Sequence, residues 1–257
     1  MVGLPENGLA MTTQLLIYKS AVPINRTLHH DCCVDIGANY TFTSEVNSVP
    51  LMAVEFPMAA SEYAIVFGGT EADLTPAAIL GVRSNENLFL AEDGSWLAKY
   101  IPAFVRRYPF VFSHTEGNFV LCVDEEFSGF NREGRGQRLF MEDGSPTPYV
   151  EGILKFLQDY QTQFLTTQRF CNRLKELGLL EPMTAQVNLE SGPPLSLGGF
   201  MAVNRAKLKA LPGETLAELA KTDELELIYT HLHSLRNFDR LRERLGHQTA
   251  DEPHTIN

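Results

Sequence analysis

The stretch LHHDCCVD, residues 28–35, holds the side chains of a metal site within eight positions. Imidazole nitrogens, thiolates and carboxylates are the groups that zinc and other transition metals take as ligands in proteins. The side chains of this stretch that could act as ligands are His29, His30, Asp31, Cys32, Cys33 and Asp35. The question is whether the local geometry allows them to act together.

A strand over residues 29–36 would divide this cluster between two faces, because alternate residues of a strand point the same way. One face would carry His29, Asp31, Cys33 and Asp35, and the other His30, Cys32, Val34 and Ile36. At roughly 3.3 Å per residue, His29 and Cys33 would lie about 13 Å apart, too far for one ion with ligands about 2 Å away. We therefore expect a strand with one polar face. A metal would need further ligands from elsewhere, with candidates at His114, His231 or Glu55.

A second group of residues that could form a site combines an acid with two arginines. Glu55 sits in the apolar run PLMAVEFPMAA, and Arg106 and Arg107 precede Tyr108. A buried acid needs partners, so Glu55 is either paired structurally or tuned for function by desolvation. Adjacent helical residues diverge by about 100°, so one arginine is expected to reach inward, to an acid such as Glu55, while the other faces water. The pair either orients packed segments or clamps a carboxylate or phosphate.

Several function classes lose their sequence support. The segment REGRGQR breaks the spacing of a dinucleotide loop, and the chain contains no G-K-[ST], G-x-S-x-G or H-E-x-x-H motif. A formal charge of -11 repels phosphate backbones and argues against a general nucleic-acid binder. The longest apolar runs are far shorter than the roughly 20 residues of a membrane span. These observations predict a soluble protein.

The compartment is predicted from the start of the chain and from its cysteines. Residues 1–10 lack the charged and apolar regions of a signal peptide and precede a second possible start at Met11. The four cysteines form no C-x-x-C pair, and reduced, buried thiols are the default in a cytoplasm. We therefore expect a cytoplasmic protein, with export to the cell surface without a signal as the alternative.

Hydrophobic periodicity predicts an α+β protein, with a β-rich N-terminal half packed with a helical C-terminal half. Its expected divisions are a flexible extension (1–14), a β-rich part (15–127), a loop or linker (128–148), a helical part with short strands (149–246) and a flexible tail (247–257). Turn residues predict one hairpin around Asp93-Gly94 and a second with its tip at residues 116–118. Between them a short helix is expected to begin at Pro102 and end before Pro109.

The second half is predicted to be mainly helical. Apolar residues at three- and four-residue steps indicate one long helix over residues 150–177, closed near Gly178. Two short strands around a Pro-Pro turn and a short helix at GETLAELA should follow. A final helix is expected to begin at the N-cap Thr222 and run to Leu245.

The segments NSVPLMAVEFP, ENLFL, DGSW, YIPAFVRRYPF, LGGFMAVN and LELIYTHLHSL resemble the SapC family of bacterial proteins, over about Leu15 to Leu245. This is the surface-layer-associated type and not the transporter permease of the same name. His29 and Asp31 match an H-x-D pattern of the family, whereas Cys32 and Cys33 depart from it. The resemblance also maps onto Asn47, Glu55, Phe56, Tyr63, Phe67, Asn87, Trp96, Arg106, Arg107, Tyr108 and Pro109.

The resemblance implies an accessory or binding protein rather than a particular catalytic activity, and it identifies no cofactor. Family members look like neighbours of outer-membrane nutrient receptors, flavin-dependent halogenases and cupin-like oxygenases. The resemblance therefore implies a part in the uptake or modification of a substrate, and it implies a flavin-dependent halogenase or a cupin-like protein as the partner. The expected ligand-binding set is His29, Asp31, Asn47, Glu55, Trp96, Arg106, Arg107 and Tyr108. Two alternatives remain open: a metal-assisted enzyme that uses His29 and Asp31, and a structural protein of the surface layer.

Overall fold

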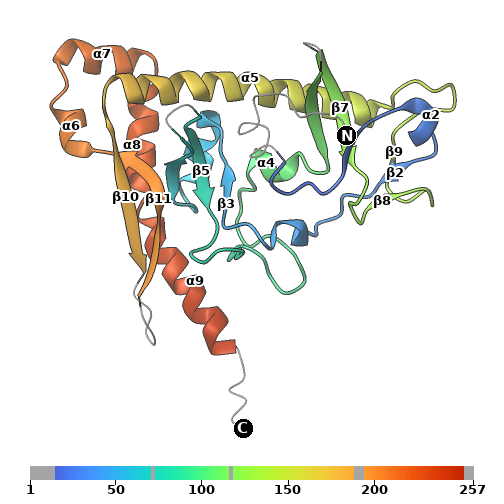
Figure 1. Cartoon of the computed structure of the whole chain (residues 1–257), viewed down its shortest axis with the longest axis horizontal. Helices are drawn as coiled ribbons and strands as arrows, with labels where there is room; N and C mark the ends of the chain where they lie inside the picture. Colours follow the sequence, from blue (N-terminus) through green and yellow to red (C-terminus); the bar gives the residue numbers. More distant parts are fainter. Residues whose placement is uncertain (1–14, 71–72, 116–117, 188–193, 252–257) are drawn as a thin grey trace, which may run out of the picture.

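A computed structural model describes residues 15–70, 73–115, 118–187 and 194–251. Its longest element is helix α5 (Pro148–Glu176), whose 29 residues make it about 44 Å long. Figure 1 shows α5 running along the length of the described part of the chain, with three small sheets beside it. Strands lie mainly in the N-terminal half and helices mainly in the C-terminal half, which confirms the predicted α+β class.

The largest sheet combines both halves of the chain in the order β10-β11-β4-β5-β3. Its strands are β3 (Ser48–Pro50), β4 (Ile65–Gly68), β5 (Thr75–Ile79), β10 (Leu180–Val187) and β11 (Leu195–Val203). All neighbours pair antiparallel, and β11 meets β4 through the pair Met201–Phe67. The hairpin β10–β11, longer than the two short strands expected, thus completes a sheet that begins in the N-terminal half.

Two three-stranded sheets lie toward the other end of α5 (Figure 1). One has the order β1-β7-β6, from β1 (Ala21–Pro23), β6 (Phe110–Thr115) and β7 (Asn118–Asp124). The other has the order β8-β2-β9, from β2 (Cys33–Val34), β8 (Phe130–Asn131) and β9 (Gln137–Arg138). The pairing of β6 with β7 confirms the second predicted hairpin, whose expected tip falls partly outside the described residues. The hairpin at Asp93-Gly94 is reduced to one bridge, Leu90–Trp96, around a turn in which Gly94 has φ +80°.

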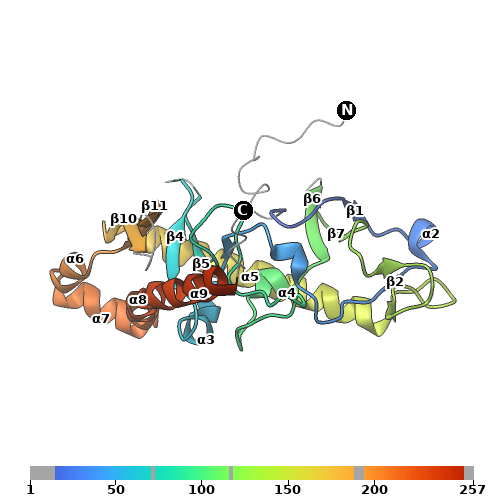
Figure 2. The same ribbon diagram turned by 90° about the horizontal axis from the view of Figure 1, so that it is seen from below.

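The helices connect and cover these sheets (Figure 2). They are α2 (Arg26–His29), η1 (Thr41–Thr43), η2 (Ala53–Glu55), α3 (Phe56–Ala59), α4 (Ala103–Arg106), α6 (Arg205–Lys209), α7 (Gly213–Lys221), α8 (Glu224–Ser234) and α9 (Asn237–Asp251). The predicted short helix after Pro102 is α4, and the Tyr108–Pro109 bond that follows it is cis. The predicted long helix is α5, capped by Thr147 and followed by Gly178 at φ +61°, a conformation that glycine adopts without steric cost.

The predicted strand over residues 29–36 is largely wrong. Asn25 caps a helical turn there by accepting the Thr27 amide on its side chain at 2.7 Å, and that turn, α2, ends at His29. Only Cys33 and Val34 form a strand. Both are buried because β2 is the middle strand of its sheet, so the expected polar face is absent.

The predicted final helix is two helices. Between α8 and α9, Ser234 Oγ donates to the His231 carbonyl and accepts the Ile65 amide, and Asn237 Nδ2 donates to the carbonyls of Ala60 and Tyr63. These tertiary bonds outweigh the continuous apolar spacing and break the helix. Thr222 is the C-cap of α7 rather than an N-cap, and Asp223 at φ +61° precedes α8.

Two further boundaries differ from prediction. The loop expected over residues 128–148 contains the short strands β8 and β9. Helix α9 continues to Asp251, into the predicted tail, and residues 252–257 lie outside the described part. Within the described residues, no helix has both the length and the apolar content that crossing a bilayer requires.

A main hydrophobic core runs through the described structure, and Met52, Ala103 and Tyr160 form a small second cluster. The largest fully buried side chains of the main core include Phe56, Phe67, Phe89, Phe104 and Phe110. Helix α5 contributes Leu157, Phe170 and Leu174 to the same core. All four cysteines are free and buried.

His231 is the satisfied core histidine that its place on the apolar stripe of the sequence indicates. It is fully buried, its Nδ1 lies 2.9 Å from the Ile65 carbonyl, and its Nε2 accepts the Val203 amide at 3.0 Å. The ring therefore ties α8 to β4 and β11. Burial lowers the pKa of His231 to about 4.

This depressed pKa predicts acid sensitivity. Between pH about 6.5 and about 4 the unfolded chain protonates His231 and the folded chain does not, so stability falls as pH falls through this window, by up to about 3 kcal/mol. His231→Gln should remove this part of the slope when the free energy of unfolding is measured in urea at several pH values. The exposed His233→Gln is the control. An unchanged slope in His231→Gln would contradict the assignment.

Candidate functional site

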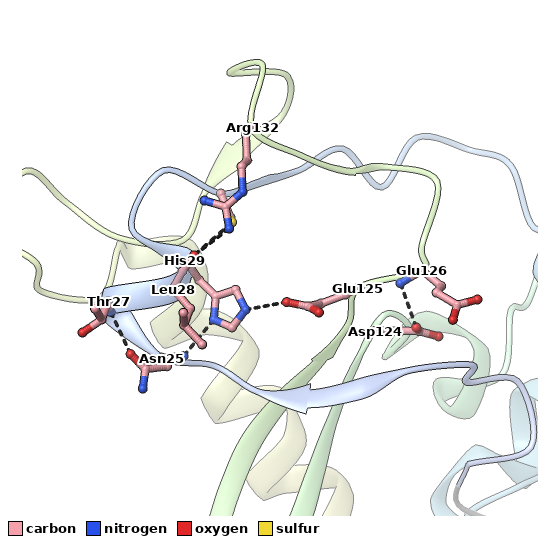
Figure 3. Close-up of polar contacts among 9 residues, drawn as sticks. Asn25, Thr27, Leu28, His29, Asp124, Glu125, Glu126 and Arg132 are labelled. Carbon is pink, nitrogen blue, oxygen red and sulfur yellow. Dashed lines mark hydrogen bonds and ion pairs between the residues drawn. The ribbon is translucent and has the colours of Figure 1, made fainter.

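His29 is buried in a network of hydrogen bonds (Figure 3). Its Nδ1 accepts the Asn25 amide at 2.9 Å, so Nε2 carries the ring proton and donates to Glu125 Oε1 at 2.9 Å. Beside it, Arg132 Nη2 donates to the Leu28 carbonyl at 2.7 Å. Both ring nitrogens are therefore occupied by contacts that fix α2 against the end of β7.

Asp31 does not join His29. Its carboxylate is exposed and pairs with His30 Nδ1 at 3.0 Å, a contact that lowers the pKa of Asp31 and raises that of His30. Within the described ranges, no three His, Cys, Asp or Glu side chains are grouped so that they could hold a metal ion. The geometry of His29 and Asp31 thus favours a structural role for the first and a surface position for the second.

Glu55 is the centre of a second network. One carboxylate oxygen accepts the Met52 amide at 2.7 Å, and the other accepts the Ala103 amide and the Tyr100 hydroxyl, each at 2.7 Å. Glu55 is only 4% exposed, so these charge-assisted bonds replace the water that it loses. The predicted Arg–Glu pair is therefore wrong: two amides and a phenol hold the carboxylate.

The Glu55 network fixes helix α4 at its first residue, Ala103, and α4 ends in the two arginines. They diverge as helical geometry predicts: Arg107 is 4% exposed, whereas Arg106 is exposed. Arg106 Nε donates to the Ile101 carbonyl at 2.9 Å. Its guanidinium lies between two rings, 5.9 Å from the centre of Tyr100 and 5.4 Å from that of Phe156.

Arg107 is surrounded by aromatic rings. Its guanidinium carbon lies 4.4 Å from the ring centre of Phe104, 4.9 Å from Tyr160 and 5.6 Å from Tyr18. A desolvated guanidinium over ring faces is attracted by their quadrupoles. The positive charge of Arg107 is thus held inside the fold, whereas the neighbouring Arg106 lies at the surface.

Both arginines line an open groove of about 360 Å³ between α4 and the first turns of α5. Its other walls are Ile36, Phe110, Pro148, Tyr149, Gly152, Ile153 and Phe156. The groove therefore presents an apolar surface with positive charge at one side. No carboxylate in the described part of the chain forms an ion pair with Arg106, although the whole sequence is acidic.

Two tyrosines of α5 carry buried hydroxyl groups, and one of them, Tyr160, packs against Arg107. The hydroxyl oxygens of Tyr149 and Tyr160 are buried, and no hydrogen-bond partner for them is found among the described residues. Burial raises the pKa of each phenol to about 12, so both remain protonated donors at neutral pH. Tyr149 lines the groove itself.

The remaining predicted residues are placed elsewhere. Asn47 donates to the Arg83 carbonyl, and Trp96 Nε1 donates to Tyr63, whose hydroxyl donates to the Tyr100 carbonyl. Through Tyr63, Trp96 thus helps to hold Tyr100, whose hydroxyl donates to Glu55. Tyr108 donates to Asp124 at 3.2 Å.

Sequence reasoning missed Asp124 and Tyr149. Asp124 is fully buried and accepts the amides of Lys19, Ser20 and Glu126, so it joins the start of the described chain to the end of β7. The alternating pattern of β7 gave no sign of this buried acid. Tyr149 follows Pro148, the first residue of α5, but nothing in the spacing indicated that its side chain lines a groove.

The fold and this groove define an α+β protein with an arginine-lined candidate binding site between a short and a long helix. The chain belongs to the SapC family, whose model matches residues 24–241. The match spans all the elements that build the groove. Searches of curated proteins and of solved structures find no match for the chain.

The Glu55 network predicts a specific stability loss. Glu55→Gln places an amide NH₂ against donors, so at least one buried bond is lost and unfolding should become about 2–3 kcal/mol easier. Urea denaturation at pH 7 measures this change. Glu62→Gln is the matched control, because among the described residues that partly exposed carboxylate accepts only the Lys99 amide. Equal stability of Glu55→Gln and the wild type would contradict the role assigned to the network.

Proposed function

We propose that this chain is an accessory binding protein that holds a small anionic ligand in the groove between α4 and α5. The observation that carries the proposal is Arg106, an exposed guanidinium without an ion-pair partner among the described residues, set on the wall of a groove. Its planar donors suit a carboxylate or phosphate. The volume of about 360 Å³ is at the lower end of the range for small-molecule sites.

The contacts of Arg106 support a defined binding site for the anion rather than a loose surface contact. Its Nε is anchored on the Ile101 carbonyl, and its guanidinium contacts the rings of Tyr100 and Phe156. These three contacts limit the orientations that the side chain can adopt. The Glu55 network holds the segment on both sides of Ile101, so less freedom remains to be lost when a ligand binds.

The lining of the groove supports binding over catalysis. None of the described residues that line it is a carboxylate, an imidazole or a thiol, the groups that most often act as general bases or nucleophiles. The polar side-chain atoms of Glu55 and His29 are already engaged in structural hydrogen bonds. In such an accessory role, a partner enzyme would supply the chemistry. The family resemblance implies a flavin-dependent halogenase or a cupin-like protein as that partner. The four free, buried cysteines support action in the cytoplasm.

The first test uses simple anions. Sodium acetate and sodium phosphate, titrated at constant ionic strength, should shift the backbone amide resonances of Gly152 and Ile153 with saturation at millimolar concentrations. Arg106→Gln should weaken this binding at least fivefold, because it removes the charge-assisted donors.

Arg236→Gln is the control, since Arg236 is also exposed but lies between α8 and α9. It should bind both anions like the wild type. Shifts that never saturate, or equal affinities in all three proteins, would overturn the proposed function.

A further inference from the structure

We infer that the ligand of the groove is a carboxylate carried on an apolar body, a small organic acid rather than an inorganic anion or a phosphate ester. This inference rests on the proposed function and adds the chemical class of the ligand. It follows from three features of the groove: its walls, its donors and its floor.

The walls are apolar along most of their length. Phe110 comes from β6, Ile153 and Phe156 from α5, and Ile36 from the segment after β2. Ile36 is 39% exposed, one of the large apolar side chains that the described structure leaves in contact with water. A ligand body that covers these side chains gains free energy in proportion to the apolar area removed from water. An inorganic anion would leave that gain unused.

The donors suit a carboxylate better than a phosphate. The guanidinium of Arg106 is a planar group of donors on the groove wall, which matches the two oxygens of a carboxylate. A phosphate monoester brings three terminal oxygens and about two negative charges, more acceptors than this set of donors satisfies.

The floor of the groove is open because α5 has a glycine there. A Cβ built at Gly152 meets no atom within 4 Å, so the space above this residue is empty of side chains. Tyr149 and Phe156, three residues before Gly152 and four after it, lie on the same face of α5 and line the same groove. We call the open space above Gly152 the slot; a flat or narrow apolar body fits there, with its carboxylate toward Arg106.

The test is a ligand series measured by isothermal titration calorimetry on the full chain. Acetate, butyrate, hexanoate and phenylacetate vary the apolar body, while phenylacetamide removes the charge and phenyl phosphate changes the head group. Each methylene that enters the groove should tighten binding about fourfold. Phenylacetate should bind at least tenfold more tightly than phenylacetamide and than phenyl phosphate.

Variants place this binding in the groove. Gly152→Leu puts a side chain into the slot and should weaken phenylacetate at least tenfold. Gly213→Leu is the matched control, because a Cβ at this glycine of α7 also meets no atom within 4 Å and the residue does not line the groove; it should bind phenylacetate like the wild type.

The outcomes separate the two proposals. If acetate binds through Arg106 but longer acids bind no better, the ligand class is wrong and the proposed function stands. If phenyl phosphate binds as tightly as phenylacetate, the head group assigned here is wrong. If phenylacetamide binds as tightly as phenylacetate, or if no anion binds, the proposed function falls together with this inference.

Discussion

A single buried carboxylate organises the region on which the candidate site depends. Glu55 accepts hydrogen bonds from residues 52, 100 and 103, which lie in two segments without long regular structure of their own. Backbone amides in such segments lose water when they are buried and must find other acceptors. The carboxylate supplies them with more acceptor sites than a carbonyl could. The place where α4 begins, and therefore the direction in which its arginines leave the backbone, follows from this one side chain.

The groove results from the meeting of two helices of very different length. Helix α4 has four residues and owes its position to its neighbours, whereas α5 has 29 residues and packs along much of the core. Arg107 turns into the aromatic interior and Arg106 turns toward α5, because adjacent helical residues diverge. One cation thus stabilises the fold by contact with rings, and the other is left at the wall of a space lined by apolar side chains.

The sequence predicted the features that depend on local pattern. The α+β class, the long helix α5, the short helix after Pro102 and the hairpin β6–β7 follow from periodicity and from proline and turn residues. The divergence of Arg106 and Arg107 was predictable from helix geometry. The features that failed depend on tertiary hydrogen bonds. Asn237 and Ser234 break an apolar stripe that looked continuous, and the partners of Glu55 lie up to 48 positions away in the sequence.

The residues of the candidate site divide in the same way, into those that the sequence could identify and those that it could not. Arg106, Arg107 and Glu55 were identified by residue type, because charges beside apolar runs require an explanation. Asp31, Asn47 and His29 were grouped with them, but the structure places these side chains away from the groove lining. Tyr149 and Gly152 carried no sequence signal, since a tyrosine and a glycine in a helical pattern have many uses. Their meaning depends on α4 lying opposite them.

Gly152 has a further consequence for the helix in which it lies. A glycine within a helix costs about 0.5–1 kcal/mol relative to alanine, because its backbone loses more conformational freedom on folding. Nothing packs against this position, so no tertiary contact compensates for the cost. A chain selected for stability alone would fill it with a better helix former. Helix α5 therefore gives up stability near its N-terminus, on the side where the groove is.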